Sequence, residues 1–165
     1  MIKQLIPQEF CLKCKGCCRF SAADSVWSPS LLEEEGRALA KNKTPPVLVS
    51  GTARLRLVQL PEGEGFACPF LIPQTNKCKV YRLRPLECQL YPFLLNRSEN
   101  GRKIFLALDL HCPFIAQNRN DHQTEEYIAY LSGLFNTPRY VKMIRDNPRF
   151  IQNYPGVVNL RKLEF

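Results

Sequence analysis

Long apolar segments are absent from this sequence of 165 residues, and no run in it is long enough to span a membrane. The first ten residues, MIKQLIPQEF, have one lysine but no sustained apolar core and no small-residue cleavage site, so they do not resemble a signal peptide. Lysine and arginine never gather in a block of five or more, although the formal net charge is +8. We therefore expect a cytoplasmic protein with no membrane partner, and nucleic acid is disfavoured as a ligand.

Signatures of several enzyme classes are also lacking. The sequence has no glycine-rich cofactor loop and no clear acid–base pair. Cys14 and Cys18 have the first gap of the Cys-x3-Cys-x2-Cys pattern used in radical chemistry with S-adenosylmethionine, but Ser21 stands where the third cysteine is needed. Neither His111 nor His122 begins the His-x-Glu motif of the zinc deaminases. These patterns therefore assign no reaction to the chain.

Cysteine, in contrast, is abundant. The chain has eight, and four of them lie in EFCLKCKGCCRF at residues 9–20. A reducing cytoplasm keeps thiols free to bind metal, and a disulfide between the neighbours Cys17 and Cys18 would be strained. A metal centre is therefore expected, with ligands drawn from all eight thiols. These are Cys11, Cys14, Cys17, Cys18, Cys68, Cys78, Cys88 and Cys112.

The spacing of the cysteines favours an iron–sulfur cluster. Residues 11–17 hold three cysteines at two-residue gaps, which is the opening spacing of bacterial ferredoxins, and proline follows two of the later cysteines. Structural zinc more often uses two Cys-x2-4-Cys pairs, whereas the three cysteines from Cys68 to Cys88 are ten residues apart. Thiolates bind both metals. We therefore expect a [4Fe–4S]-type cluster, with zinc as the alternative.

Hydrophobic periodicity and turn residues predict an α+β fold of short elements. Residues 27–43 have the pattern of a helix, which Ser28 or Ser30 can cap. Residues 53–60 alternate between arginine or another polar residue and an apolar one, as in a half-buried strand with its arginines in water. Residues 62–65 follow as a turn. The four cysteines of the first cluster are expected to precede the first helix, and the other four to lie at strand ends or turns.

Two hairpins are expected in the middle of the chain. A polar turn at residues 74–77 would join two short strands and bring Cys68 and Cys78 close together. Asn100-Gly101 would close a second hairpin over residues 91–110, because glycine permits a left-handed backbone. Each hairpin carries or leads into a cysteine, so the second half of the cysteine set would be held by β structure.

The last third of the chain is predicted to be mostly helical. One helix is expected from Thr124 and another from Thr137, where proline follows at the first helical position. The segment after Pro148 shows no clear pattern. The buried face of the first of these helices is predicted to contain Tyr127, Ile128, Leu131 and Leu134.

Two motifs resemble those of the YkgJ-type cysteine-cluster proteins, a family of zinc- or iron-chelating domains. The first is Cys-x2-Cys-x2-Cys-Cys at residues 11–18. The second is CKVYRLRPLECQLYPF, residues 78–93, which couples two cysteines, an aliphatic–tyrosine pair and Arg-Pro. The resemblance covers roughly residues 11–114 and implies a cysteine-cluster domain over residues 1–120. Residues 121–165 would then be a helical extension packed on the same domain.

The resemblance also suggests roles around the metal. Its second motif contains Tyr81, Arg84, Pro85 and Tyr91. We expect the tyrosines to pack around the site and exclude water, and Arg84 to offset thiolate charge, pair with Glu87 or bind a substrate carboxylate. His111 is expected to face solvent at a strand end.

Two functional classes stay open from the sequence. In the first, the protein is a metal-binding or electron-transfer module. Eight thiolates on two dipositive centres would leave a net charge of about +4, which suits an acidic protein partner or substrate. In the second, the chain is a protein-modifying enzyme, since the family also occurs in flagellin lysine N-methylases.

Overall fold

The computed structural model describes residues 2–41, 47–49, 52–60, 63 and 65–164. The chain forms two compact units. One, here called the cysteine-rich unit, spans residues 6–89, and the other, the sheet–helix unit, combines residues 1–5 with residues 90–165. Both contain helices and antiparallel strands, which confirms the predicted α+β class. None of the described helices has the length and apolar character needed to cross a membrane. The division at residue 120 stays a prediction.

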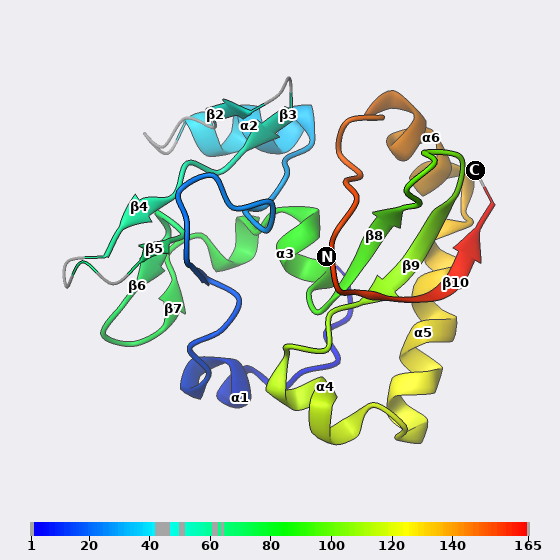
Figure 1. Cartoon of the computed structure of the whole chain (residues 1–165), viewed down its shortest axis with the longest axis horizontal. Coiled ribbons are helices and arrows are strands. Elements are labelled where there is room, and N and C mark those ends of the chain that lie inside the picture. Colours follow the sequence, from blue (N-terminus) through cyan, green and yellow to red (C-terminus); the bar gives the residue numbers. More distant parts are fainter. Residues whose placement is uncertain (1, 42–46, 50–51, 61–62, 64, 165) are drawn as a thin grey trace. The chain divides into compact units, whose positions relative to one another are not determined.

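The cysteine-rich unit is built from very short elements (Figure 1). Its strands form three small antiparallel sheets in the orders β1-β5-β4, β2-β3 and β6-β7. A cluster of buried leucine, alanine and phenylalanine side chains, which includes Cys68, forms its core. The helices are α1 (Gln8–Lys13), α2 (Glu33–Ala40), the 3-10 turn η1 (Tyr81–Leu83) and α3 (Leu86–Leu90), which ends at the first residue of the other unit. The strands are β1 (Arg19–Phe20), β2 (Val47–Val49), β3 (Thr52–Arg54), β4 (Val58–Gln59), β5 (Phe66–Ala67), β6 (Leu71–Ile72) and β7 (Lys77–Cys78).

The sheet–helix unit has one three-stranded antiparallel sheet in the order β10-β9-β8 (Figure 1). The predicted hairpin at residues 91–110 is confirmed, and Gly101 in its turn has a φ of 71°. Helix α5 packs on the sheet, because the rings of Phe93 and Tyr127 lie 5.2 Å apart. Tyr127 also donates a hydrogen bond to the carbonyl of Lys3, which attaches the first residues to this unit. The elements are β8 (Phe93–Arg97), β9 (Ile104–Leu108), α4 (Pro113–Asn118), α5 (His122–Phe135), α6 (Pro138–Asp146) and β10 (Val158–Leu163).

The predicted cap of the helix at residues 27–43 is wrong. The helix begins at Glu33, and its N-cap is Leu32, whose backbone N–H donates to the carboxylate of Glu35. Ser28 cannot cap the helix because its hydroxyl donates to the carbonyl of Leu55, 2.6 Å away. Ser30 pairs with Arg54 in an isolated antiparallel bridge. The hydroxyl of Ser28 and the backbone of Ser30 are therefore used for contacts with residues 55 and 54, and the helix starts later.

The strand predicted at residues 53–60 is divided into β3 and β4, with residues 55–57 outside both. Arg54 was expected to face water, but it is 8% exposed, whereas Arg56 is exposed as predicted. Pairing with Ser30 draws residue 54 inward, so simple alternation does not hold there. In the turn predicted at residues 62–65, Gly63 and Gly65 have left-handed backbones, and residues 62 and 64 lie outside the described part.

The helices predicted near Thr124 and Thr137 are confirmed as α5 and α6. Phe135 rather than Leu134 completes the buried face of α5, because Leu134 is only partly buried. The unassigned tail ends in strand β10, which pairs with β9. Backbone hydrogen bonds to β9, a strand some fifty residues earlier, stabilise β10. A strand of this kind can form without a strong local alternation of apolar and polar residues.

Candidate metal centre

Seven of the eight cysteines lie in the cysteine-rich unit. Cys112 lies in the sheet–helix unit, at the N-cap position of α4. All eight are free thiols. Cys11 was expected to precede the first helix, but it lies inside α1. This helix was not predicted, because it has only six residues and no side-chain cap. Cys11 and Cys17 are exposed, Cys68 and Cys112 are buried, and the other four are partly buried.

One asparagine attaches the first cysteine cluster to the β6–β7 hairpin. Asn76 has a left-handed backbone in the hairpin turn, with a φ of 53°. Its side-chain amide donates to the carbonyl of Leu12 at 2.9 Å, and its Oδ1 accepts from the guanidinium of Arg19 at 2.8 Å. These two bonds hold both sides of the residues 13–18 loop, so Asn76 positions cysteines that precede it by about sixty residues.

The predicted approach of Cys68 and Cys78 is observed. Strands β6 and β7 pair antiparallel, with Leu71 opposite Cys78. Cys68 belongs to the core cluster of the unit, and Cys78 packs against the same cluster. Backbone N–H groups donate to both sulfurs, from Phe70 and Leu71 to Cys68 and from Val80 to Cys78. Such donors stabilise the ionised thiolate that a metal binds.

Burial dominates the acid–base properties of these inner thiols. It raises the pKa of Cys68 to about 12, and it raises the pKa of Cys78 and of Cys88 as well. The ionised form loses its hydration there, and each thiolate would repel its neighbours. A positive metal ion reverses both effects, because it replaces hydration by coordination and cancels negative charge.

Cys17 and Cys18 differ in charge state although they are neighbours. Their side chains are hydrogen-bonded, and this bond, with help from the charges of Arg19 and Arg84, lowers the pKa of Cys18 to about 7. The same bond raises the pKa of Cys17. Cys18 is therefore substantially ionised at neutral pH even without metal, and Cys17 holds the proton.

The residues of the second sequence motif have distinct positions. The guanidinium carbon of Arg84 lies 4.0 Å from the centre of the Tyr81 ring. Tyr81 itself is 37% exposed, so the expectation that it packs inside a dry site is wrong. Arg84 lowers the pKa of Cys18 and of Cys78, which supports its expected part in offsetting thiolate charge. Pro85 is fully buried and precedes α3.

Two glutamates in this unit fix the helix that carries Cys88. Glu87 accepts a hydrogen bond from the backbone N–H of Ser30 at 2.5 Å. Glu35 accepts from the N–H groups of Leu32 and Leu86, at 2.9 and 2.6 Å, and so joins the first turns of α2 and α3. Burial raises the pKa of Glu35, while these two bonds act in the opposite direction.

Tyr91 takes part in a hydrogen-bonded chain within the sheet–helix unit. Its hydroxyl donates to one oxygen of Asp109 at 2.9 Å, and the other oxygen of Asp109 lies 2.7 Å from Nδ1 of His111. The Asp109 carboxylate is buried, whereas the His111 side chain is 81% exposed, as predicted. Sequence reasoning missed Asp109, although the Asp-x-His spacing beside Cys112 could have suggested it.

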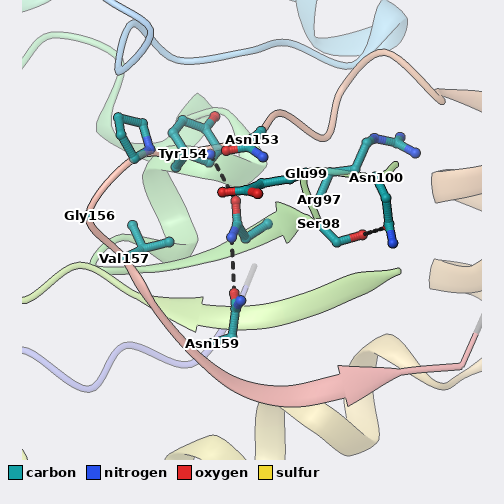
Figure 2. Close-up of a pocket in the computed structure, with 11 residues that line it drawn as sticks. Arg97, Ser98, Glu99, Asn100, Asn153, Tyr154, Gly156, Val157 and Asn159 are labelled. Atoms are coloured by element: carbon teal, nitrogen blue, oxygen red, sulfur yellow. Dashed lines mark hydrogen bonds between the residues drawn. The ribbon is translucent and has the colours of Figure 1, made fainter. Parts of the chain in front are cut away.

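A polar pocket of about 490 Å³ is also present in the sheet–helix unit (Figure 2). Residues 96–100, 153–157 and 159 line it, and neither cysteine nor histidine occurs among its described lining residues. Asn96 is buried in its wall, where its Oδ1 accepts from the backbone N–H of Tyr154 and its Nδ2 donates to Asn159. Both polar atoms of the Asn96 side chain are hydrogen-bonded, and these two bonds attach residues 154 and 159 to strand β8.

The thiol set fits a soft or borderline metal, although the thiols do not form a finished coordination sphere. Within the described ranges, no three His, Cys, Asp or Glu side chains have the arrangement that a metal ion requires. Cys68 and Cys78 nevertheless have N–H donors and lie at an apolar cluster, and the charge of Arg84 acts on Cys18 and Cys78. These features stabilise thiolate ligands once they ionise.

A protein-family model matches most of the chain. The family model CxxCxxCC, described as a "Putative zinc- or iron-chelating domain", matches residues 10–113. This span includes all eight cysteines and most of the chain. No solved structure matches the chain.

Proposed function

The chain belongs to the CxxCxxCC family of zinc- or iron-chelating domains, and on this premise we propose that its cysteines hold an iron–sulfur cluster of the [4Fe–4S] type, with zinc as the alternative. The observation that carries the proposal is the gathering of seven thiols in one unit of 84 residues. A single zinc ion takes four ligands, so this unit has more sulfur than one zinc needs. The spacing of Cys11, Cys14 and Cys17 favours the cluster.

The proposed role is that of a binding or electron-transfer module. Metal-free thiols with raised pKa values are poor nucleophiles and poor ligands until a cation lowers those values, so the inner cysteines serve metal binding better than covalent catalysis. Thiolate ligation needs reduced cysteines, and the cytoplasm is therefore the proposed location. An acidic protein surface is the proposed partner, because the chain keeps a positive charge after ligation.

The test is purification without oxygen, followed by iron, zinc and acid-labile sulfide analysis and an absorption spectrum. Iron with an equal amount of sulfide and a broad visible absorption band is the expected result. Colourless protein with bound zinc would replace the iron–sulfur assignment by a zinc-chelating one. Protein that retains neither metal, and takes up neither on anaerobic reconstitution, would contradict metal binding altogether.

A further inference from the structure

Strand pairing places Cys18 directly against Cys68. In the β1–β5 pair Arg19 lies opposite Ala67, so the next residues outward on the two strands are Cys18 and Cys68. The backbone N–H of Cys68 donates to the carbonyl of Cys18 at 3.0 Å, which extends the ladder through both cysteines. The separation of these two residues is therefore set by the backbone and does not depend on a metal.

A second pair of backbone contacts adds Cys78 to this arrangement. The N–H of Leu71 donates to the carbonyl of Cys68, and the N–H of Lys79 donates to the carbonyl of Phe70, at 3.0 and 2.8 Å. Both bonds flank the β6–β7 pairing that contains Cys78. Cys18, Cys68 and Cys78 consequently contact one hydrophobic cluster.

Cys88 approaches the same place from α3. Ionised Cys18, Cys68 and Cys78 each repel an ionised Cys88, and Cys18, Cys68 and Cys78 repel one another in the same way. Every pair among the four therefore interacts. Helix α3 is fixed to the rest of the unit by Glu35 and Glu87, so Cys88 is held on an anchored element.

Cys11 and Cys14 have a different setting, whereas Cys17 is hydrogen-bonded to Cys18 and lies beside the set. Cys11 is exposed and lies in the short helix α1. The sulfur of Cys14 lies beside Gly16, where an added Cβ would be 3.3 Å away, so this thiol packs against its own loop. Cys11 and Cys14 thus lie away from the core cluster, whereas Cys68 belongs to it and Cys18 and Cys78 pack against it.

We propose that Cys18, Cys68, Cys78 and Cys88 form one four-thiolate metal centre, and that Cys11 and Cys14 lie outside its ligand set. This division rests on the proposed metal-binding function. The geometry that carries it for Cys18, Cys68 and Cys78 is the strand register of β1–β5 and β6–β7 together with the shared core cluster. Cys88 is added from α3, which Glu35 and Glu87 anchor. The four sulfurs would close on the metal by rotation about χ1, since their backbones are already fixed.

Charge and coordination chemistry agree with this division. Four thiolates around a dipositive ion carry a net charge of about −2. Arg19 and Arg84 are the two cations that act on Cys18. Together they offset that charge. The run that contains Cys11 and Cys14, whose spacing supports the proposed iron–sulfur cluster, is left for a second and more exposed centre.

The experiment compares two matched double variants with the wild-type chain. Reduced, metal-free protein is titrated with Co²⁺ under nitrogen, and the absorption of tetrahedral cobalt–thiolate coordination is followed. We expect C11S/C14S to keep a four-thiolate cobalt spectrum at the first equivalent and C68S/C78S to lose it. Loss in C11S/C14S with retention in C68S/C78S would overturn the division. A wild-type chain that binds no Co²⁺, Zn²⁺ or iron would instead overturn the proposed function.

A second measurement avoids the variants, because C68S/C78S removes core side chains and can unfold the unit. The wild-type chain is alkylated with iodoacetamide, with one equivalent of Zn²⁺ or with chelator, and each cysteine is quantified by mass spectrometry. Zinc is expected to slow the alkylation of Cys18, Cys78 and Cys88 at least tenfold and to leave Cys11 and Cys14 nearly unchanged. Equal protection of both groups at one equivalent, or protection of Cys11 and Cys14 alone, would overturn the division.

Discussion

A methyl group at Gly65 would lie 2.7 Å from the carbonyl oxygen of Phe20, a distance that the backbone cannot accept without moving. Gly65 also has a φ of 93°. Gly65→Ala therefore combines a clash with backbone strain, and we expect it to lower the free energy of unfolding by about 2–4 kcal/mol. Denaturant unfolding followed by Trp27 fluorescence would measure the loss.

Gly63→Ala is the matched control for this prediction. Gly63 also has a positive φ, 74°, but an added Cβ there has no described atom within 4 Å. The cost is then the left-handed backbone alone, about 1 kcal/mol. Equal losses in the two variants would show that contact with Phe20 does not limit residue 65.

The charge of Arg84 is expected to control the reactivity of Cys18. In metal-free protein, Cys18 has a pKa of about 7, lowered first by its bond with Cys17 and then by Arg19 and Arg84. Its alkylation rate should therefore rise with pH through about 7. Arg84→Gln removes one positive charge and should move this midpoint upward, whereas Arg84→Lys should leave it nearly in place. The measurement is the pH profile of Cys18 alkylation by mass spectrometry, and an unmoved midpoint in Arg84→Gln would contradict it.

At the scale of elements, the start of α2 and the start of α3 depend on one side chain. Glu35→Ala leaves the N–H groups of Leu32 and Leu86 without their carboxylate acceptor. We expect a loss of about 2–4 kcal/mol in the free energy of unfolding, from two donors deprived of a partner. The neighbouring Glu34 is exposed, and Glu34→Ala should change stability by less than about 0.5 kcal/mol. Similar losses of unfolding free energy in both variants would show that the bonds of Glu35 to α2 and α3 do not stabilise the fold.

Because the pKa of Glu35 is raised, the contribution of its carboxyl group to the free energy of unfolding depends on pH in a known direction. Burial makes the folded chain hold the proton more tightly than the unfolded chain, whose carboxyl titrates near 4.5. The contribution of Glu35 is then full below that pH and declines as the pH rises through its folded pKa. Glu35→Gln, which cannot ionise, should remove this decline. Unfolding curves of both proteins between pH 4 and pH 7 would show it as a smaller slope in the variant, and parallel slopes would contradict the prediction.

At the scale of the whole molecule, metal removal should act mainly on one of the two units. The single tryptophan, Trp27, lies in the cysteine-rich unit, whereas α5 and α6 lie in the sheet–helix unit. Metal binding couples to folding only where the ligands are. Chelator should therefore lower the unfolding midpoint seen by Trp27 fluorescence more than the midpoint seen by far-UV circular dichroism.

The size of this shift follows from mass action. A ligand present at a hundred times its dissociation constant stabilises the folded state by about 2.7 kcal/mol, so its removal should lower the fluorescence midpoint by several degrees. Coincident midpoints with and without metal, by both probes, would show that the metal does not organise the cysteine-rich unit.

Local patterns were sufficient for the elements whose stabilising contacts are local. The hairpin around Gly101 and the two C-terminal helices follow from turn residues, proline positions and apolar periodicity, and all three are confirmed. The start of α2 was missed because Ser28 and Ser30 bond with residues 54 and 55, which no local signal indicates. The buried Arg54 and the strand β10 were missed for the same reason, since pairing with distant backbone decides both.

The sequence by itself determined that this chain is a metal-chelating protein, because soft thiolates at close, repeated spacing are a chemical property of the residues and need no fold to be recognised. It also determined the hairpin that brings Cys68 and Cys78 together. Only the tertiary structure decided that Cys18 meets Cys68, that Asn76 anchors the first cluster, and that Asp109 lies between Tyr91 and His111. The first two of these contacts join residues fifty or more positions apart, and their register is set by backbone hydrogen bonds and core packing, which local spacing does not encode.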